Sequence, residues 1–358
     1  MLFGFYWYCT GFQYQYDINI SIVTGKDEER PPPVNTTLPS ERIVFYNTEN
    51  LFHPSDDSIK ADEDFTPDGP YHWTYKRYYE KINKLGKLIV AIGEGRMPAI
   101  IGLCEVENRI VLKDILNKTI LKRYSYKIIH KESPDLRGID VALLYDAAKF
   151  LPLKYEFLDV SGGFFPEMKT RDILHVEGLF HDSAHCHIFV NHWPSRRGGQ
   201  MASEAKRLAV AAMLNQYVDS CFIQDNCSNI IIMGDFNDEP GDHSLSHILG
   251  AEDPIHMVDS IMLYNLMYPY FRKGEGTHFR INNFREAAIL DQIIVSKAVL
   301  FGKNGIKLKD DHARIYRNEF LLDKKNGIPL RTFQGLKYLG GFSDHLPVYT
   351  DIQIISSL

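Results

Sequence analysis

The chain has 358 residues, 44% of them hydrophobic, which is enough for one large domain or two smaller ones around a substantial core. Its 40 basic and 46 acidic residues give a formal net charge of -6, which excludes a global positive field that would attract nucleic acid. A polyanionic substrate would therefore have to be held by a local basic patch or through metal ions.

The cysteine and hydrophobic patterns leave the cellular compartment open. The five cysteines are odd in number and lack the C-x-x-C spacing of a zinc site, so we expect no disulfide framework, although Cys221 and Cys227 are close enough to pair if the protein is exported. No stretch approaches the roughly 18 consecutive apolar residues of a membrane span. The aromatic-rich residues 1–12 lack a basic n-region and make a poor signal peptide.

One composition change marks a domain boundary. The polar stretch Lys26–Ser40 contains three consecutive prolines and is typical of an extended, poorly ordered segment. No later stretch shows a comparable break, and no internal repeat is visible. We therefore predict a partly disordered N-terminal extension over residues 1–40 and one domain over residues 41–358.

Short apolar runs alternate with amphipathic stretches along this domain. Thr74 can cap a helix that runs to about Ile92, with apolar side chains at helical spacing on one face. The basic residues beside that face, Lys76, Arg77, Lys81, Lys84 and Lys87, are expected to be solvated. Further helices are predicted over residues 111–121, 203–218 and 244–249. Strands are predicted over residues 42–47, 99–104, 126–130, 139–145, 174–180, 187–190, 229–233 and 289–296, with a last strand after His345.

Polar side chains recur where these buried strands end. Glu105 follows one apolar run directly, and such a carboxylate is costly to bury without a cation or hydrogen-bond donors. Asp291 lies within another apolar run and needs a partner for the same reason. The other polar groups at strand ends are Asn47, His192, Asp235 and Asn237, and Asp344 and His345 precede the last strand.

The segment Asn229–Pro240 (N-I-I-I-M-G-D-F-N-D-E-P) is the strongest of these signals. Asp235 and Asn237 lie two residues apart, so on extended chain their side chains would share a side. The carboxylate could hold a cation or orient a water, and the amide could contact a phosphoryl oxygen. The same letters also fit a strand that ends in an Asx turn.

Three arginines lie on glycine-bearing loops that could bind phosphate. Arg137 stands in S-P-D-L-R-G-I-D, and Arg196 and Arg197 follow His192 in N-H-W-P-S-R-R-G-G. A guanidinium can clamp a phosphate with two hydrogen bonds. Oxygen ligands together with phosphate-binding groups favour a hard ion, Mg²⁺ or Mn²⁺, which would polarise a phosphoryl oxygen while water attacks in line.

In this order the motifs resemble those of the endonuclease/exonuclease/phosphatase superfamily, the fold shared by pancreatic deoxyribonuclease and the apurinic repair endonucleases. The resemblance covers about residue 41 to the C-terminus. F-Y-N-T-E-N-L-F, E-V-E-N, R-G-I-D-V-A-L-L-Y, N-H-W-P-S-R, M-G-D-F-N-D and S-D-H are similar to a bacterial branch with undefined substrates. The resemblance implies a four-layer α/β sandwich of two packed mixed β-sheets flanked by helices.

The resemblance also implies roles for individual side chains. Glu105 would be the principal metal ligand, helped by Asn47 and Asp344. Asp235 would orient or deprotonate the attacking water. The phosphate would be held by Asn47, Arg137, Arg196 and Asn237. His345, positioned by Asp291, and His192 would contact the scissile phosphate from two sides, and Tyr145 is a candidate for the tyrosine that some members hold near it.

We therefore expect a monomeric, Mg²⁺- or Mn²⁺-dependent phosphodiester hydrolase, an endonuclease or exonuclease acting on DNA or RNA. The negative net charge leaves open a phosphatase or phospholipid phosphodiesterase acting on a small or lipid phosphoester. A catalytically silent binding module is a third alternative. The sequence does not decide between one metal ion and two, nor which residue is the general base.

Overall fold

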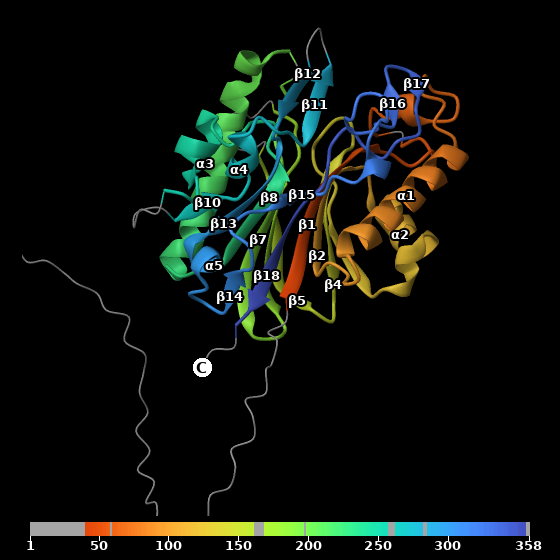
Figure 1. Ribbon diagram of the computed structural model, residues 1–358. Helices are drawn as coiled ribbons and strands as arrows, with labels where there is room; N and C mark the ends of the chain where they lie inside the picture. Colours follow the sequence, from red (N-terminus) through yellow and green to blue (C-terminus); the bar gives the residue numbers. More distant parts are fainter. Residues whose placement is uncertain are drawn as a thin grey trace, which may run out of the picture. The chain divides into compact units, whose positions relative to one another are not determined.

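Two seven-stranded β-sheets pack face to face and are covered by helices on their outer faces (Figure 1). The computed structural model describes residues 40–57, 59–160, 168–196, 198–256, 262–281 and 285–355, all within one compact unit. The expectation for residues 1–40 therefore falls outside the described residues except at Ser40, and so does Arg197. Within the described part, no helix is both long and apolar enough to cross a membrane.

The first sheet contains β1 and its neighbours. Its strand order is β14 (Ile306–Leu308), β18 (Val348–Ile354), β1 (Ser40–Leu51), β2 (Ile100–Val106), β4 (Asp140–Asp146) and β3 (Tyr126–His130), and β15 (Arg314–Ile315) also pairs with β18. β1 and β2 run parallel, whereas β18 lies antiparallel to β1. The sheet is therefore mixed, as the resemblance implied.

The second sheet is also mixed. Its order is β5 (Phe150–Leu158), β6 (Ile173–Phe180), β7 (Ala184–His192), β8 (Ile230–Asp235), β13 (Asp291–Ser296), β10 (Leu263–Asn265) and β9 (Ala251–Glu252). β7 and β8 run parallel, and β13 is antiparallel to β8. Gly234 permits the close approach of β8 to β7, because a Cβ atom there would lie 2.6 Å from the Asn191 carbonyl oxygen.

Helices form the two outer layers. α1 (Tyr75–Gly93) and α2 (Arg109–Lys118) cover the first sheet, α3 (Gln200–Gln224) covers the second, and the short helices α4 (Tyr268–Phe271) and α5 (Lys297–Phe301) connect strands. Single turns of 3₁₀-helix occupy Glu63–Phe65, Ile120–Arg123 and Glu319–Leu321, and a π-turn occupies Ser244–Ile248. Two hairpins complete the described elements: β11 (His278–Ile281) with β12 (Arg285–Ala288), and β16 (Phe333–Gln334) with β17 (Lys337–Tyr338).

Three apolar cores follow from this layering. The central core lies between the sheets, with Phe45 and Leu143 facing Val176 and Ile231. A second core fills the space beneath α1 and α2, and a third lies beneath α3. The four-layer α/β sandwich implied by the sequence resemblance is confirmed.

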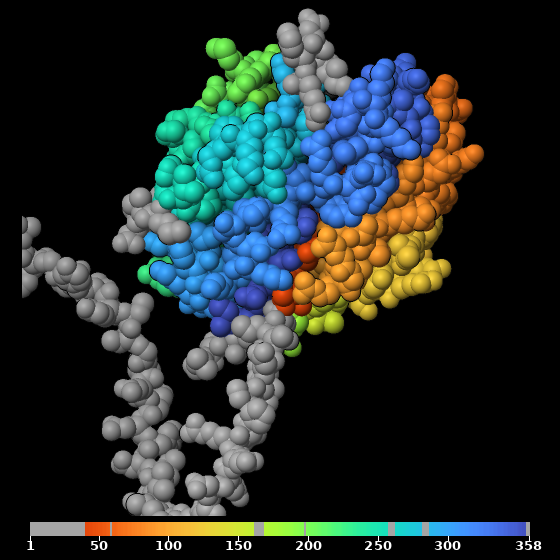
Figure 2. All heavy atoms as spheres, viewed as in Figure 1, coloured from red at the N-terminus to blue at the C-terminus, as the bar shows by residue number. Residues whose placement is uncertain are grey.

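Helix α1 begins as predicted, since the Thr74 hydroxyl accepts the Arg77 N–H, but the prediction of a wholly solvated basic face is wrong. Lys81 is buried, and its ammonium donates to the Glu49 carbonyl and to the Thr332 hydroxyl. The loop that contains Thr332 and Gly340 covers this side of α1, where Lys84 donates to the Gly340 carbonyl. Figure 2 shows this loop in blue against the orange residues of α1.

Candidate active site

The two sheets bring their polar strand ends together at one edge. Asn47 on β1 and Asp235 on β8 come from different sheets, and the Asn47 Nδ2 donates to Asp235 Oδ2 over 2.9 Å. In the second sheet, Asp235 pairs with His192 on one side and with Asp291 on the other. Parallel strands end at the same edge, and β13 begins where β8 ends, so these side chains meet.

Asp235 lies at the centre of this group. Its Oδ2 is 3.8 Å from His192 Nε2 and 3.9 Å from His345 Nε2, and its Oδ1 accepts the Asn237 N–H over 3.0 Å. Burial raises the pKa of Asp235, although the nearby His345 acts in the opposite direction. A buried carboxylate between two imidazoles can accept a proton from a bound water.

His345 is held by the expected carboxylate. Its Nδ1 is 2.7 Å from Oδ2 of the fully buried Asp291, and its backbone N–H donates to the Ser343 hydroxyl. Burial alone would lower the pKa of His345, but the carboxylates of Asp291 and Asp235 raise it well above its ordinary value. His345 is therefore an imidazolium at neutral pH, with Nε2 directed toward Asp235.

His192 has the opposite protonation state. Burial, followed by the positive charge of Arg171, lowers the pKa of His192 well below its ordinary value. Its Nδ1 is buried without a hydrogen-bond partner among the described residues, and its Nε2 lies 3.8 Å from Glu105 Oε1. The site thus contains one charged and one neutral imidazole.

Glu105 lies within β2, whereas the sequence predicted that it would follow the strand directly. The register of β2 against β4 shifts between Cys104 and Val106, and Glu105 has a left-handed backbone with φ of 59°. Such a β-bulge turns a side chain away from the regular alternation. Glu105 Oε2 accepts the Asn50 N–H over 2.8 Å, whereas Oε1 faces His192.

Asn237 does not share a strand side with Asp235, so that expectation is wrong. Its φ is 52°, because the chain leaves β8 in the Asx turn closed by the Asp235 carboxylate. The Asn237 Nδ2 donates to the Trp193 carbonyl over 3.0 Å. Its amide therefore holds the loop after β7 in place, and Asn237 also lines the cleft.

The two arginines expected at the phosphate have different surroundings. Arg196 donates to the Asn237 carbonyl and pairs with Asp238 and Asp242, so its guanidinium already has protein partners. Arg137 remains 41% exposed and lies 3.5 Å from Asp135. Arg137 is thus the one of the two that is available to an incoming anion.

Tyr145 does not reach the site. It pairs with Ile100 at the start of β2, whereas Glu105 lies near the end of that strand. At about 3.3 Å per residue, five residues separate them by roughly 17 Å. Its ring packs edge-on against Phe150 instead.

A family-model search agrees with this geometry. The model described as the Endonuclease/Exonuclease/phosphatase family matches residues 42–354. The chain belongs to this family. Its members are hydrolases of phosphoester bonds, and the protein is therefore a phosphoester hydrolase. No curated protein matches the chain.

Solved structures share the fold at low sequence identity. D. rerio TDP2 complexed with single-strand DNA product has 12% identity and a TM-score of 0.54, over 88% of this chain and 99% of that chain. A mannosyl-6-phosphatase from Bacteroides thetaiotaomicron has 16% identity and a TM-score of 0.54, over 87% and 99%. An endonuclease/exonuclease/phosphatase family protein from the same organism has 14% identity and a TM-score of 0.55, over 89% and 99%.

The cleft beside this family site is a cavity of about 570 Å³. It contains His345, Arg137 and Asn237. Arg196, also expected at the phosphate, lines it as well. The remaining lining residues were not assigned a role from the sequence; they are Asn50, Phe52, Ala61, Asp64, Phe65, Tyr71, Ser195, His278, Arg280 and Leu290. Most come from the β1–α1 loop and the β11–β12 hairpin, whose sequences carry no periodic signal.

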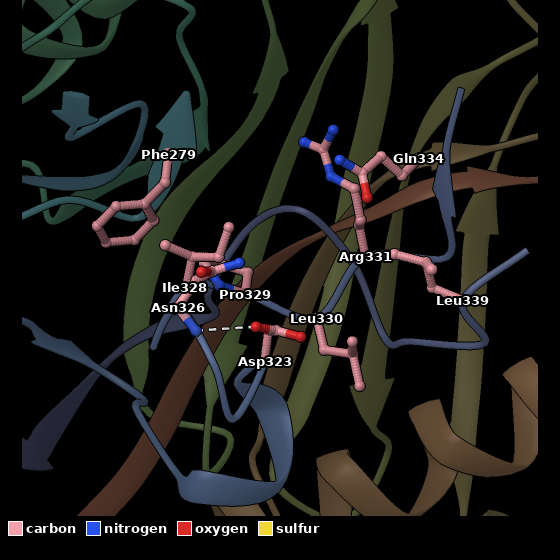
Figure 3. Close-up of a pocket in the computed structure, with 9 residues that line it drawn as sticks. All are labelled: Phe279, Asp323, Asn326, Ile328, Pro329, Leu330, Arg331, Gln334 and Leu339. Atoms are coloured by element: carbon pink, nitrogen blue, oxygen red, sulfur yellow. Dashed lines mark hydrogen bonds between the residues drawn. The ribbon is translucent and has the colours of Figure 1, made fainter. Parts of the chain in front are cut away.

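A smaller hollow of about 140 Å³ lies within the loop over residues 323–339 (Figure 3). Asn326 N–H donates to the Asp323 carboxylate at its rim. Arg331 lines this hollow and also pairs with Asp344 over 3.1 Å. The hollow contains none of the candidate catalytic side chains, so the larger cavity is the better candidate for the substrate site.

The donor set fits a hard divalent cation of the kind that this family uses. Burial and the carboxylate of Asp344 raise the pKa of Glu105, whereas His345 and Arg137 act in the opposite direction, and a divalent cation would offset the charge of the two carboxylates further. Glu105 Oε1 lies 3.8 Å from His192 Nε2, and the Asn47 amide oxygen, which accepts the Glu49 N–H over 2.9 Å, has a second lone pair to offer. Oxygen donors of this type suit Mg²⁺ or Mn²⁺.

Proposed function

We propose that the protein is a divalent-metal-dependent phosphodiesterase that cleaves single-stranded nucleic acid. The observation that carries the proposal is the convergence on Asp235 of His192 and of His345, the latter held by Asp291. Such an arrangement places a base, a charged donor and a neutral imidazole around one phosphoryl group.

Each side chain has a role that follows from its contacts. Asp235, held by the Asn47 amide and the Asn237 N–H, accepts a proton from the attacking water. The His345 imidazolium donates through Nε2 to a phosphoryl oxygen, and its charge offsets the negative charge that develops there. His192 accepts or donates a hydrogen bond to the same group from the β7 side.

Glu105, Asn47 and Asp344 would hold the metal ion. When bound, the ion neutralises phosphate charge and supports the leaving oxygen. Arg137 faces the cavity and binds a second phosphate or a phosphoryl oxygen. The left-handed conformation of Glu105 and the hydrogen bond from Asn50 orient its carboxylate before any ligand arrives.

Two observations favour a nucleic-acid strand. Arg137 and the exposed Arg280 both line the cavity, which gives it local basic groups although the whole chain has a net charge of -6. Its other wall is aromatic, with Phe52, Phe65 and Tyr71 in one continuous stack. A related fold in D. rerio TDP2 is complexed with single-strand DNA.

A small phosphomonoester is the second candidate. The cavity is bounded in volume, and Asp64 in its wall would accept hydrogen bonds from sugar hydroxyls. The structure of a mannosyl-6-phosphatase shares this fold. The net charge of -6 also disfavours long polyanions at low salt.

A substrate panel separates the two candidates. The purified chain is incubated with single-stranded DNA, RNA, plasmid, sugar phosphates and phospholipid head groups, each with Mg²⁺, Mn²⁺ or chelator. We expect chelator-sensitive cleavage of the single strands. Turnover of sugar or lipid phosphates with intact nucleic acid would overturn the nuclease proposal in favour of the second candidate.

A matched pair of variants tests the site itself. His345→Ala should abolish turnover of any substrate that the panel finds. His256→Ala changes an exposed histidine that does not line the cleft, and it should leave turnover unchanged. Equal activity of both variants would show that the catalytic centre lies elsewhere.

A further inference from the structure

A group of metal-ligand side chains lies under α3, away from the cleft. His175 on β6, His187 on β7 and Cys221 on α3 are all buried where the helix covers the second sheet. Apolar side chains, among them Phe189, Val218 and Ile230, surround them. Buried polar groups in such a place carry a desolvation cost, so their presence calls for a physical reason.

The three side chains converge closely. One ring nitrogen from each histidine and the Cys221 Sγ all lie within 4.8 Å of one another. His175 Nε2 is 3.0 Å from His187 Nδ1, and the two rings are stacked with centroids 5.3 Å apart. The opposite nitrogen of His175, Nδ1, is 3.0 Å from the Glu156 carboxylate.

We infer that His175, His187 and Cys221 form a binding site for a thiophilic transition-metal ion such as Zn²⁺. Two imidazoles and a thiolate suit zinc, whereas Mg²⁺ would prefer oxygen ligands. In a tetrahedral site with Zn–N distances of 2.0–2.1 Å, the two nitrogens would lie about 3.3 Å apart. Small rotations of the rings suffice to reach that separation from the observed 3.0 Å.

The surroundings match those of a metal-binding histidine. Glu156 holds the far nitrogen of His175, as carboxylates commonly do for zinc-bound imidazoles. Glu177 is the cross-strand neighbour of His187 and pairs with His185 over 2.8 Å. The fourth position of a tetrahedral site would then be taken by water.

The ligands also have suitable protonation states. Burial lowers the pKa of His175, and burial together with His175 lowers the pKa of His187 to about 4, so both imidazoles are neutral at pH 7. Burial raises the pKa of Cys221 to about 11. Binding of the metal would therefore release the thiol proton to solvent.

This site is separate from the hydrolytic centre. His187 precedes His192 by five residues on β7, roughly 17 Å along an extended strand. The hydrolytic centre has a thiol of its own, since Cys104 lies within 4.8 Å of ligand atoms of His192 and Asp235. Any test must distinguish Cys221 from Cys104.

Cobalt spectroscopy makes that distinction. The full chain is freed of metal with chelator, saturated with Mg²⁺, and titrated with Co²⁺, which gives a near-ultraviolet charge-transfer band only when a thiolate binds it. We expect the band at one equivalent in the unmodified chain, in Cys104→Ser and in Cys227→Ser. It should be lost in Cys221→Ser and weakened at least tenfold in apparent affinity in His187→Gln.

Several outcomes would overturn the inference. These are no band in the unmodified chain, a band that persists in Cys221→Ser, or a band that disappears in Cys104→Ser. Circular dichroism checks that each variant folds. If Cys221→Ser does not fold, Cys104→Ser still decides, because in this variant the Co²⁺ band must persist, and Zn²⁺ must displace it and raise the melting temperature in the presence of excess Mg²⁺.

Discussion

Two buried histidines in this molecule, His345 and His187, have opposite charge states, although burial acts on both in the same direction. In the cleft, His345 is flanked by Asp291 and Asp235, and its pKa is raised well above the ordinary value. Under α3, His187 has a second imidazole beside it, and its pKa falls to about 4. Burial lowers the pKa of both histidines, and only His345 has carboxylates beside it whose negative charge outweighs burial.

The largest effect is expected at Asp235, the carboxylate between His192 and His345. Asp235→Asn removes the proposed base while keeping the shape of the side chain. We expect kcat to fall by about 10³-fold to 10⁴-fold, at the upper end of what a general base contributes. The control is Asp219→Asn, which changes an exposed carboxylate on α3. Normal turnover by Asp235→Asn would assign the base elsewhere.

Asp291→Asn tests whether His345 depends on its neighbour. The variant keeps a hydrogen-bond acceptor but removes the negative charge that raises the pKa of His345. We expect kcat to fall by roughly tenfold to a hundredfold, as for other groups that orient a catalytic side chain, with KM little changed. Steady-state kinetics and a melting curve check this. An unchanged kcat in a folded variant would refute the pairing.

The low pKa of His187, which lies beside His175 under α3, leads us to expect that stability depends on pH. His187 has a pKa of about 4 in the folded protein and about 6.5 when unfolded, so the unfolded chain binds more protons between these values. Stability is therefore lost as the pH falls from 6.5 toward 4.

His187→Phe should remove that loss. Urea unfolding of metal-free protein at pH 7 and pH 4.5 would show a drop in unfolding free energy that is roughly 1–3 kcal/mol smaller in the variant. Equal drops in both proteins would mean that His187 is not buried in its neutral form.

The smallest effect concerns Arg137, which contributes to the low pKa of His192 from the cavity wall. Arg137→Gln should raise KM about tenfold and leave kcat within a few-fold, because a charge-assisted hydrogen bond to phosphate is lost in ground and transition states alike. A fall in kcat with constant KM would instead place Arg137 at the scissile phosphate.

The sequence predicted which polar side chains would meet better than it predicted their surroundings. Glu105, His192 and Asp235 could be found because each follows a short apolar run that can only be a buried strand. The amino-acid sequence did not show that Asn237 adopts a left-handed backbone or that Arg196 is held by Asp238 and Asp242. Both features depend on how the loop after β7 packs against the loop after β8.

The misses in the fold have the same origin. Strand β5 was not predicted, because Pro152 interrupts its apolar residues and argues against a strand that is not at a sheet edge. Lys81 has helical spacing typical of a surface position, but a distant loop covers it. A local sequence pattern predicts the structure of its own segment, whereas the burial of Lys81 depends on Thr332, which lies 251 positions later in the chain.

The β-bulge at Glu105 has a consequence for engineering. A non-glycine residue with φ of 59° costs on the order of 1 kcal/mol relative to glycine, and here that residue is also a buried acid. Glu105→Gly would relieve this strain, but it would also remove the proposed metal ligand and the acceptor of the Asn50 N–H. Thermostability campaigns on this scaffold should therefore leave this position alone.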